Sequence, residues 1–197
     1  MSTVSFSQAC ENNKGPILAV LQPAFTHCQR VLEIGSGTGQ HAVHFATHMP
    51  HLFWQCSDLP VHHSAIRERL ISAGRENIAT PIALDVAGPW PEDLFDAVFT
   101  ANTLHIMGWP EVEQFFAGVG RILPKGGVLA VYGPFNYNGA YTSDSNARFD
   151  EWLKKRDSKS GIRDVEAVHQ LASNIGLQRQ GDHTMPANNR CLVWVRR

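Results

Sequence analysis

The chain has 197 residues, 43% of them hydrophobic and 18% charged, which is enough apolar material for one globular domain with a substantial core. Its formal net charge of -1 gives no global positive field that would attract nucleic acid or an anionic membrane. Met1 to Gln8 lack the pattern of a secretory signal, and no apolar run is long enough to span a bilayer. We therefore expect one cytoplasmic domain over residues 1–197, with neither nucleic acid nor a membrane as a partner.

The first predicted helix follows a polar stretch. Apolar side chains recur at helical spacing over residues 17–21, and Pro16 suits the first position of a helix. We expect residues 1–28 to form a leading helical segment over the mouth of a cleft. Asn13 and Lys14 lie just before this helix, and a solvated loop with a helix cap is the alternative to a role in binding.

A glycine-rich turn then joins a predicted strand to a second predicted helix. Residues 31–34 form the short apolar run of a parallel strand covered on both faces, and the helix that follows the turn ends at Met49-Pro50. Gly35, Gly37 and Gly39 allow positive backbone dihedrals and let a ligand approach the main chain without meeting a Cβ atom. Their spacing differs from the Gly-x-Gly-x-x-Gly dinucleotide fingerprint. We predict a nucleotide-like cofactor at this turn.

Neither the histidines nor the cysteines form a metal-binding pattern. Three imidazoles recur at helical spacing on the second helix, but no His-Glu-x-x-His-like arrangement accompanies them, so we expect solvated helix residues. They are His41, His44 and His48. The scattered cysteines lack paired spacing, so we expect reduced thiols and no metal site. They are Cys10, Cys28, Cys56 and Cys191, of which we expect the last two in strands.

Two acidic residues stand where predicted strands end. The strand over residues 52–56 leads to Asp58, about twenty residues beyond the glycine turn, where Rossmann-like folds have the carboxylate that hydrogen-bonds the ribose hydroxyls. A carboxylate there would repel a 2′-phosphate, which argues against NADP. After a helix over residues 61–73, a third strand over residues 81–84 ends at Asp85, for which a loop cap is the alternative.

Strands and helices continue to alternate to the end of the chain. Asn102 and His105 follow the fourth strand at the topological switch point, where a side chain borders both cofactor and acceptor. A lone histidine is more often structural, and only its location raises His105 above that. The remaining predicted elements are strands over 95–102 and 128–132, helices over 111–123 and 165–175, and an antiparallel edge hairpin of strands 177–182 and 191–195.

The acidic residue Glu33, two positions before the first glycine, completes the pattern Glu-x-Gly-x-Gly-x-Gly. This pattern resembles motif I of the class I S-adenosylmethionine-dependent methyltransferases, and the phrases at 95–98 and 121–127 resemble two further hallmarks of that class. The resemblance implies an α/β, Rossmann-like class I methyltransferase fold, with a mostly parallel seven-stranded sheet, helices on both faces and a C-terminal antiparallel hairpin. It also implies S-adenosylmethionine as cofactor and S-adenosylhomocysteine as product.

Longer phrases are similar to a small family of class I methyltransferases of unassigned function, the one that includes methyltransferase-like protein twenty-six. They span residues 11–18, 36–41, 102–106, 132–141, 146–153, 161–164 and 185–190. This resemblance covers nearly the whole chain, but the family offers no settled acceptor. At Asn12 and Gly15 the chain departs from the family, where a basic and an acidic residue are commoner, so the role of the leading loop stays open.

The resemblance implies a cofactor site at the ends of the first four strands. Glu33 would order the glycine loop and reach the methionine end of the cofactor, Asp58 would bind the ribose, and Asp85 would bind the adenine amino group. The predicted cofactor-binding residues are Glu33, Gly35, Ser36, Gly37, Gly39, Gln40, His41, Asp58, Leu59, Asp85, Val86, Asn102 and Leu104.

We expect the acceptor beside this site, with His105 and Asn102 as the catalytic candidates. A substrate-side loop and helix insertion is predicted over residues 136–164. An acceptor thiol, amine or carboxylate needs little help at neutral pH, whereas an alcohol or phenol would need a base such as His105.

The walls of the acceptor pocket are predicted from residue type. Phe135 and Tyr137 would exclude water and offer a flat wall, while Lys14 and Arg163 would suit an acceptor that carries a carboxylate or phosphate. For Arg163 the alternative is a pair with Asp164 or with a helix end. The predicted substrate-binding residues are Asn13, Lys14, Tyr132, Phe135, Tyr137, Arg163, Asn188 and Asn189.

Three functions from different classes follow from these patterns. The leading hypothesis is transfer of a methyl group from S-adenosylmethionine to a small-molecule acceptor. An NAD-dependent oxidoreductase is the second, disfavoured by the glycine spacing and by the missing Tyr-x-x-x-Lys pair, and a non-catalytic cofactor-binding module is the third. The sequence leaves the acceptor and a homodimer open.

Overall fold

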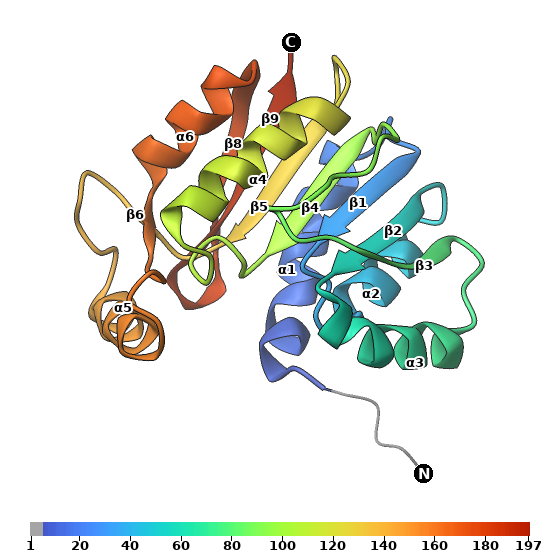
Figure 1. The fold of residues 1–197 in the computed structure, drawn as a ribbon, viewed down its shortest axis with the longest axis horizontal. Coiled ribbons are helices and arrows are strands. Elements are labelled where there is room, and N and C mark those ends of the chain that lie inside the picture. The colour runs from blue at the N-terminus through green and yellow to red at the C-terminus, as the bar shows by residue number, and fades with distance from the viewer. Residues whose placement is uncertain (1–5) are drawn as a thin grey trace.

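Within residues 6–197, which the computed structural model describes, seven strands form one sheet between two layers of helices (Figure 1). The sheet has the order β3-β2-β1-β4-β5-β9-β8; β9 runs antiparallel to both its neighbours, and the other neighbouring pairs are parallel. The predicted mostly parallel sheet with a C-terminal antiparallel hairpin is confirmed. Its strands are β1 (Arg30–Ile34), β2 (Phe53–Asp58), β3 (Ile78–Ala83), β4 (Ala97–Ala101), β5 (Val128–Gly133), β8 (Leu177–Met185) and β9 (Asn189–Arg196).

The helices cover both faces of the sheet. On one face lie α1 (Gln8–Ala24), α2 (Gln40–His48) and α3 (His63–Ala73), which follows a 3-10 turn at Pro60–His62. On the other lie α4 (Trp109–Ile122) and α6 (Val165–Asn174). The helix α5 (Asp144–Arg156) lies beyond the carboxyl ends of the strands (Figure 1). The short strand β6 (Phe135–Asn136) precedes α5 in the chain and β7 (Arg163–Asp164) follows it, and the two strands pair with each other. A 3-10 turn at Pro186–Asn188 joins β8 to β9.

Alternating side chains of the strands feed two separate apolar clusters. In β5, Val128, Ala130 and Tyr132 pack against α1 and α2, whereas Leu129 and Val131 pack against α4 and α6. Because successive side chains of a strand point to opposite faces, a run that is apolar at every position is buried on both faces. The continuous apolar runs of the sequence therefore become the central strands.

The predicted start of the first helix is wrong. The helix α1 begins at Gln8, with the Ser7 hydroxyl accepting from the Cys10 amide, and Pro16 lies in its interior. The polar Asn13 occupies the buried stripe of α1 together with Ile17 and Leu21, so the apolar pattern alone could not reveal the first two turns. Of the leading segment predicted over residues 1–28, residues 1–5 lie outside the described residues.

The third strand also begins earlier than predicted, at Ile78, and Pro81 lies within it. Since β3 is at the edge of the sheet, a proline there does not remove a hydrogen bond from a central ladder. The other predicted helices and strands are present with ends shifted by a few residues.

The described residues also bear on membranes, metals and thiols. In the part of the chain that the structure describes, no helix is both long and apolar enough to cross a membrane, and no three His, Cys, Asp or Glu side chains gather to hold a metal ion. All four cysteines are free thiols, with Cys56 in β2 and Cys191 in β9 as predicted.

Two glycines inside helices should respond oppositely to alanine. A Cβ atom at Gly118 in α4 would lie 1.9 Å from the ring of Trp90, whereas one at Gly15 in α1 would meet nothing within 4 Å. Gly118→Ala should lower the free energy of unfolding by about 1–3 kcal/mol because Trp90 must move. Gly15→Ala should raise it by up to about 1 kcal/mol through helix propensity. Chemical denaturation measures both, and a stabilised Gly118→Ala protein would contradict the packing of Trp90 on α4.

Candidate functional site

The glycine loop between β1 and α2 turns through three residues in the left-handed conformation. Gly35, Gly37 and Gly39 have φ values of 74°, 57° and 71°. A Cβ atom at Gly35 would lie 2.6 Å from Thr103 Cγ2, so this glycine admits the loop after β4 and not a ligand. A Cβ atom at Gly37 would meet no protein atom within 4 Å. The open side of the loop at Gly37 is therefore the cradle that a cofactor could fill.

Asp58 at the end of β2 anchors this loop. One carboxylate oxygen accepts from the Gly37 amide at 2.7 Å and the other accepts from the Leu59 amide at 2.7 Å. The carboxylate thus stands beside Gly37 at the carboxyl edge of the sheet, where a ribose could reach its remaining lone pairs.

Glu33 lies beneath the loop with only 2% of its surface exposed. Its carboxylate accepts from the Ser36 hydroxyl and from the Trp54 indole N–H, both at 3.0 Å. Burial raises the pKa of Glu33 to about 7, and the nearby Asp58 raises it further, while the two hydrogen bonds oppose the shift. Glu33 therefore ties Ser36, the second residue after β1, to Trp54 of β2.

The other predicted cofactor-binding residues differ in how they lie. Asp85 is exposed after β3, and its carboxylate accepts from the Ala87 amide at 2.9 Å, as a loop cap does. Leu59 is exposed and Val86 is half-buried beside it along the same edge. Leu104 is buried in the core, so its side chain packs beneath the site and does not face it.

The start of α2 links the glycine loop to α1. The Ser7 amide donates to Gln40 Oε1 at 2.5 Å, and His41 Nε2 lies 2.7 Å from Asn13 Oδ1. The prediction that His41 is a solvated helix residue is wrong: it is buried, stacks on Phe45, and burial lowers its pKa to about 4. His41 can be buried between α2 and α1 because Asn13 of α1 supplies a polar partner for its imidazole.

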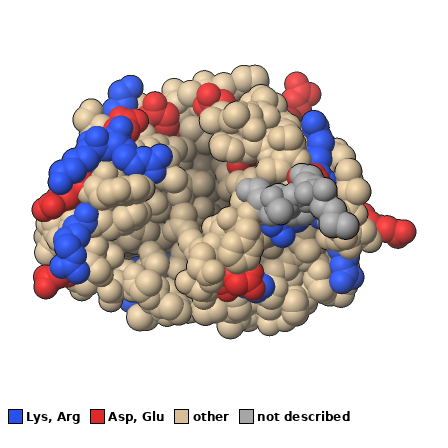
Figure 2. Space-filling model, turned by 90° about the horizontal axis from the view of Figure 1, so that it is seen from below, with Lys and Arg blue, Asp and Glu red and all other residues tan. Residues whose placement is uncertain are grey.

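A cavity of about 860 Å³ opens next to this loop, between α1, the ends of β4 and β5, α5 and the turn before β9. Seen from the carboxyl ends of the strands, the molecule is hollowed in its middle (Figure 2). Five of the predicted site residues line the cavity: Asn13, Asn102, His105, Tyr132 and Asn189. Burial raises the pKa of Tyr132, and the nearby side chains of Asn13 and Asn189 oppose that shift. The structure thus brings together residues from four distant parts of the chain.

His105 and Asn102 form the floor of this cavity. His105 is 5% exposed, its ring packs edge-on against Phe149 at 5.4 Å between centroids, and burial together with Arg163 lowers its pKa to about 4. Asn102 adopts a left-handed conformation with φ 59°, and its amide donates to the Tyr132 carbonyl at 2.8 Å. The imidazole is therefore neutral at physiological pH and available as a hydrogen-bond acceptor.

Two predicted cations do not face the cavity. Lys14 pairs with Glu11 on the surface of α1. The guanidinium of Arg163 donates to the main-chain carbonyls of Leu104, Met107 and Lys159, so it holds the loop after β4 against the end of the insertion. These donors bond neither Asp164 nor the end of a helix, the two alternatives considered for Arg163.

The predicted flat wall is also built from other residues. Phe135 is buried in the core, and the Tyr137 hydroxyl donates to Asp182 at 2.8 Å, away from the cavity lining. Asn188 does not line the cavity either: its amide donates to the Ser145 hydroxyl at 3.1 Å, and its carbonyl accepts from Asn146. Asn188 therefore fastens the turn before β9 to α5.

The helix α5 also contributes two aromatic side chains and one cation to the cavity lining. Sequence patterns place no emphasis on them, but Ser145, Phe149, Trp152 and Arg156 recur at intervals of four, three and four residues, the spacing of one helix face. This spacing is the signal by which they could have been found, once α5 was known to stand over the cavity.

The raised pKa of Glu33 predicts a pH-dependent stability. In the unfolded chain the Glu33 carboxyl has a pKa near 4.5, whereas in the folded protein it keeps its proton to about pH 7. Protonated Glu33 therefore contributes its full stabilisation below pH 4.5, and this contribution is lost as the pH rises to 7. Relative to the wild type, Glu33→Gln should gain up to about 3 kcal/mol of unfolding free energy across that interval. Urea denaturation over the pH series measures the difference, in which other titrating groups cancel. Two parallel profiles would contradict the assignment.

Three solved structures are similar to this fold. An O-methyltransferase family protein from Burkholderia thailandensis matches with a TM-score of 0.82 at 17% identity, over 93% of this chain and 56% of its own. The S-adenosylmethionine-dependent methyltransferase SibL matches with a TM-score of 0.80 at 21% identity, over 95% of this chain and 55% of its own. The mitomycin 7-O-methyltransferase MmcR matches with a TM-score of 0.84 at 17% identity, over 96% and 54%.

At these identities the similarity establishes the fold, and the prediction of a methyltransferase-like α/β fold is confirmed at that level. The chain spans little more than half the length of these three proteins. A family model, described as "Protein of unknown function (DUF938)", matches residues 4–196. Since this match takes in the glycine loop, the cavity and the C-terminal hairpin alike, the chain belongs to the DUF938 family.

Proposed function

We propose that this chain transfers a methyl group from S-adenosylmethionine to a small-molecule acceptor. One observation carries the proposal: a glycine loop that is open at Gly37 and anchored by the Asp58 carboxylate adjoins a cavity of about 860 Å³ floored by His105 and Asn102. A loop of this kind suits a nucleoside cofactor, and a cavity of this size suits a small organic molecule.

The cofactor would lie along the ends of β1, β2 and β3. Gly37 leaves room for it, Asp58 would accept from the ribose hydroxyls, and Leu59 and Val86 offer apolar surface near Asp85 for the adenine. When bound, S-adenosylmethionine supplies a methyl group already activated on a sulfonium. Glu33, Ser36 and Gln40 would act by fixing the loop and α2.

Alignment and exclusion of water would be the main catalytic contributions of the protein. Asn102 and His105 follow β4, beside the glycine loop, and both face the cavity. The neutral imidazole of His105 can accept a hydrogen bond from an acceptor hydroxyl. Because its pKa is about 4, it would take the proton only as the new oxygen–methyl bond makes that hydroxyl strongly acidic. Two of the compared structures are named O-methyltransferases, which favours an oxygen acceptor here.

Other properties remain predictions of the same proposal. They are membership of the family that includes methyltransferase-like protein twenty-six, a single methyltransferase domain, a cytoplasmic location and an assembly state that includes a homodimer as one option. An NAD-dependent oxidoreductase and a non-catalytic binding module are the competing functions. The carboxylate at Asp58 would serve an NAD ribose equally well, so cofactor binding must be measured directly.

Asp58→Ala should weaken binding of S-adenosylhomocysteine by about ten- to a hundredfold, the effect of losing roughly 1.5–3 kcal/mol of charged hydrogen bonds. Isothermal titration with S-adenosylhomocysteine and, in parallel, with NAD measures this. Asp93→Ala is the matched control, because Asp93 pairs with Arg30 at the start of β1, and it should leave the affinity unchanged. Unaltered affinity in Asp58→Ala removes the ribose assignment, and tight binding of NAD in place of S-adenosylhomocysteine supports the oxidoreductase.

His105→Gln should bind S-adenosylhomocysteine nearly as the wild type does, yet lose about a hundredfold in turnover on a hydroxyl acceptor. Methyl transfer to a panel of hydroxylated small molecules is the assay. The control is His27→Gln, because His27 is exposed and lies just before β1, at the amino ends of the strands. Full turnover in His105→Gln would withdraw it as a base. No turnover by the wild type on any acceptor class would support a binding module.

A further inference from the structure

We infer that the cavity beside the glycine loop binds a flat aromatic molecule that carries an anionic group. The aromatic part would lie against α5, and the anion would meet Arg156 at the mouth. The inference deepens the proposed function, on which it rests for naming this molecule as the methyl acceptor. It is carried by the face that α5 turns to the cavity and by the charges around it.

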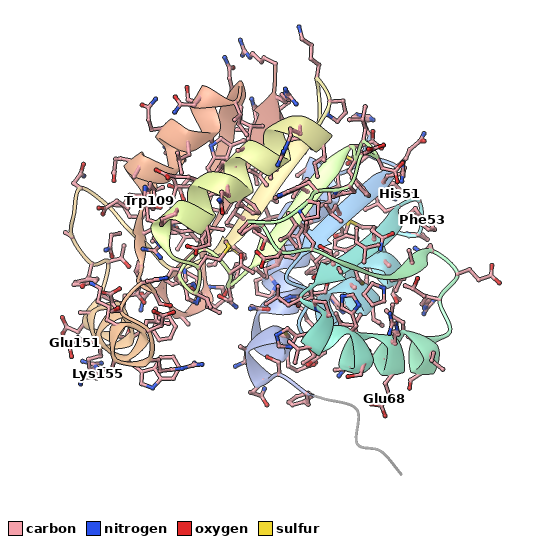
Figure 3. All side chains as sticks on the ribbon, in the orientation of Figure 1. His51, Phe53, Glu68, Trp109, Glu151 and Lys155 are labelled. Atoms are coloured by element: carbon pink, nitrogen blue, oxygen red, sulfur yellow. The ribbon has the colours of Figure 1, made fainter. Side chains whose placement is uncertain are left out.

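The helix α5 has two chemically different faces. Phe149, Trp152 and Arg156 lie three and four residues apart and line the cavity, while Glu151 and Lys155 lie on the side of α5 turned away from it (Figure 3). Since residues at this spacing share one helix face, the aromatic side chains and the guanidinium point to the same space.

The aromatic side chains of this face form a ready stacking surface. The rings of Phe149 and Trp152 are nearly parallel, at 16°, with centroids 5.8 Å apart, and Phe149 also packs against His105. Trp152 is 49% exposed, although it is among the largest apolar side chains of the chain. A half-exposed indole at a cavity mouth leaves apolar area that a planar ligand would cover with favourable stacking.

The charge around the cavity favours a ligand that carries an anionic group. Within the described residues, Arg156 is the single permanently charged side chain of the lining. Its guanidinium lies 4.8 Å from the centre of the Trp152 ring, and none of the described carboxylates pairs with it. Asp150, the buried carboxylate of α5, already accepts from Lys154, Tyr141 and Ile162. Lys and Arg side chains also gather on the side of the molecule where α5 lies (Figure 2).

The opposite wall is neutral and polar. Asn102 and Asn189 line it with side-chain amides, and Tyr132 adds a phenol. Amides can donate to or accept from ring hydroxyls and carbonyls without imposing a charge. The volume of about 860 Å³ exceeds what a single ring needs, so we expect at least two fused or linked rings.

Three matched probes test the inference by calorimetry, with S-adenosylhomocysteine saturating: a hydroxynaphthoate, the corresponding hydroxynaphthamide and the fully saturated decalin analogue of the naphthoate. The naphthoate should bind tightest. Arg156→Gln should weaken the naphthoate about tenfold and the naphthamide less than about twofold, because only the first loses a charged partner. Trp152→Leu should weaken both aromatic probes about tenfold and the decalin much less.

The matched control is Lys155→Gln, one residue before Arg156 and on the outer side of α5, which should change no affinity by more than about twofold. Equal affinity of the wild type for the three probes, or equal losses in Arg156→Gln and Lys155→Gln, would overturn the inference. The titration with S-adenosylhomocysteine reports separately on the proposed function. If that titration fails while the naphthoate binds through Arg156, the cavity holds such ligands and the methyltransferase proposal falls.

Discussion

The glycine loop holds its shape because the ends of three adjacent strands are joined by side-chain hydrogen bonds. The Ser57 hydroxyl donates to the Glu33 carbonyl at 2.7 Å, and the Thr100 hydroxyl donates to the Ile34 carbonyl at 2.8 Å. The amides of Gly35 and Ser36 both donate to the Ser57 carbonyl at 3.0 Å. The amides of Gly35, Ser36, Gly37 and Gly39 are all bonded to protein oxygens, so the sheet and Asp58 hold the loop in this shape.

A second set of polar contacts connects this loop to the cavity. Asn13 lies between the His41 imidazole and the Tyr132 hydroxyl, so one side chain of α1 contacts both the first turn of α2 and the end of β5. A polar residue can be buried there because each partner satisfies a group that would otherwise be costly to desolvate. The helix α1 therefore contacts both the start of α2 after the glycine loop and the cavity, and a shift of α1 would change both.

The position of α5 depends on contacts made far along the chain. Its buried Asp150 accepts from the Ile162 amide at 2.6 Å, and Asn146 donates to the Asn188 carbonyl at 3.1 Å. Arg163 adds three hydrogen bonds, two to carbonyls of the loop after β4 and one to the Lys159 carbonyl within the insertion. These groups hold the helix over the carboxyl ends of the strands, and its aromatic face then becomes a wall of the cavity. Trp152 packs against Phe149 and Arg156 of its own helix and is still 49% exposed at the cavity mouth, which supports the inferred ligand.

The sequence alone determined the sheet, its helices and the glycine loop, because these depend on local signals. Continuous apolar runs specify buried strands, and glycines at alternate positions specify a left-handed turn. Tertiary structure decided the burial of Asn13 and His41, the beginning of α1 and the members of the cavity wall. Residue types at Phe135, Tyr137 and Arg163 matched the chemistry expected of the wall, yet Phe149, Trp152 and Arg156 form it. No local pattern distinguishes these two sets, since the choice is made by long-range hydrogen bonds that fix α5 over the strand ends.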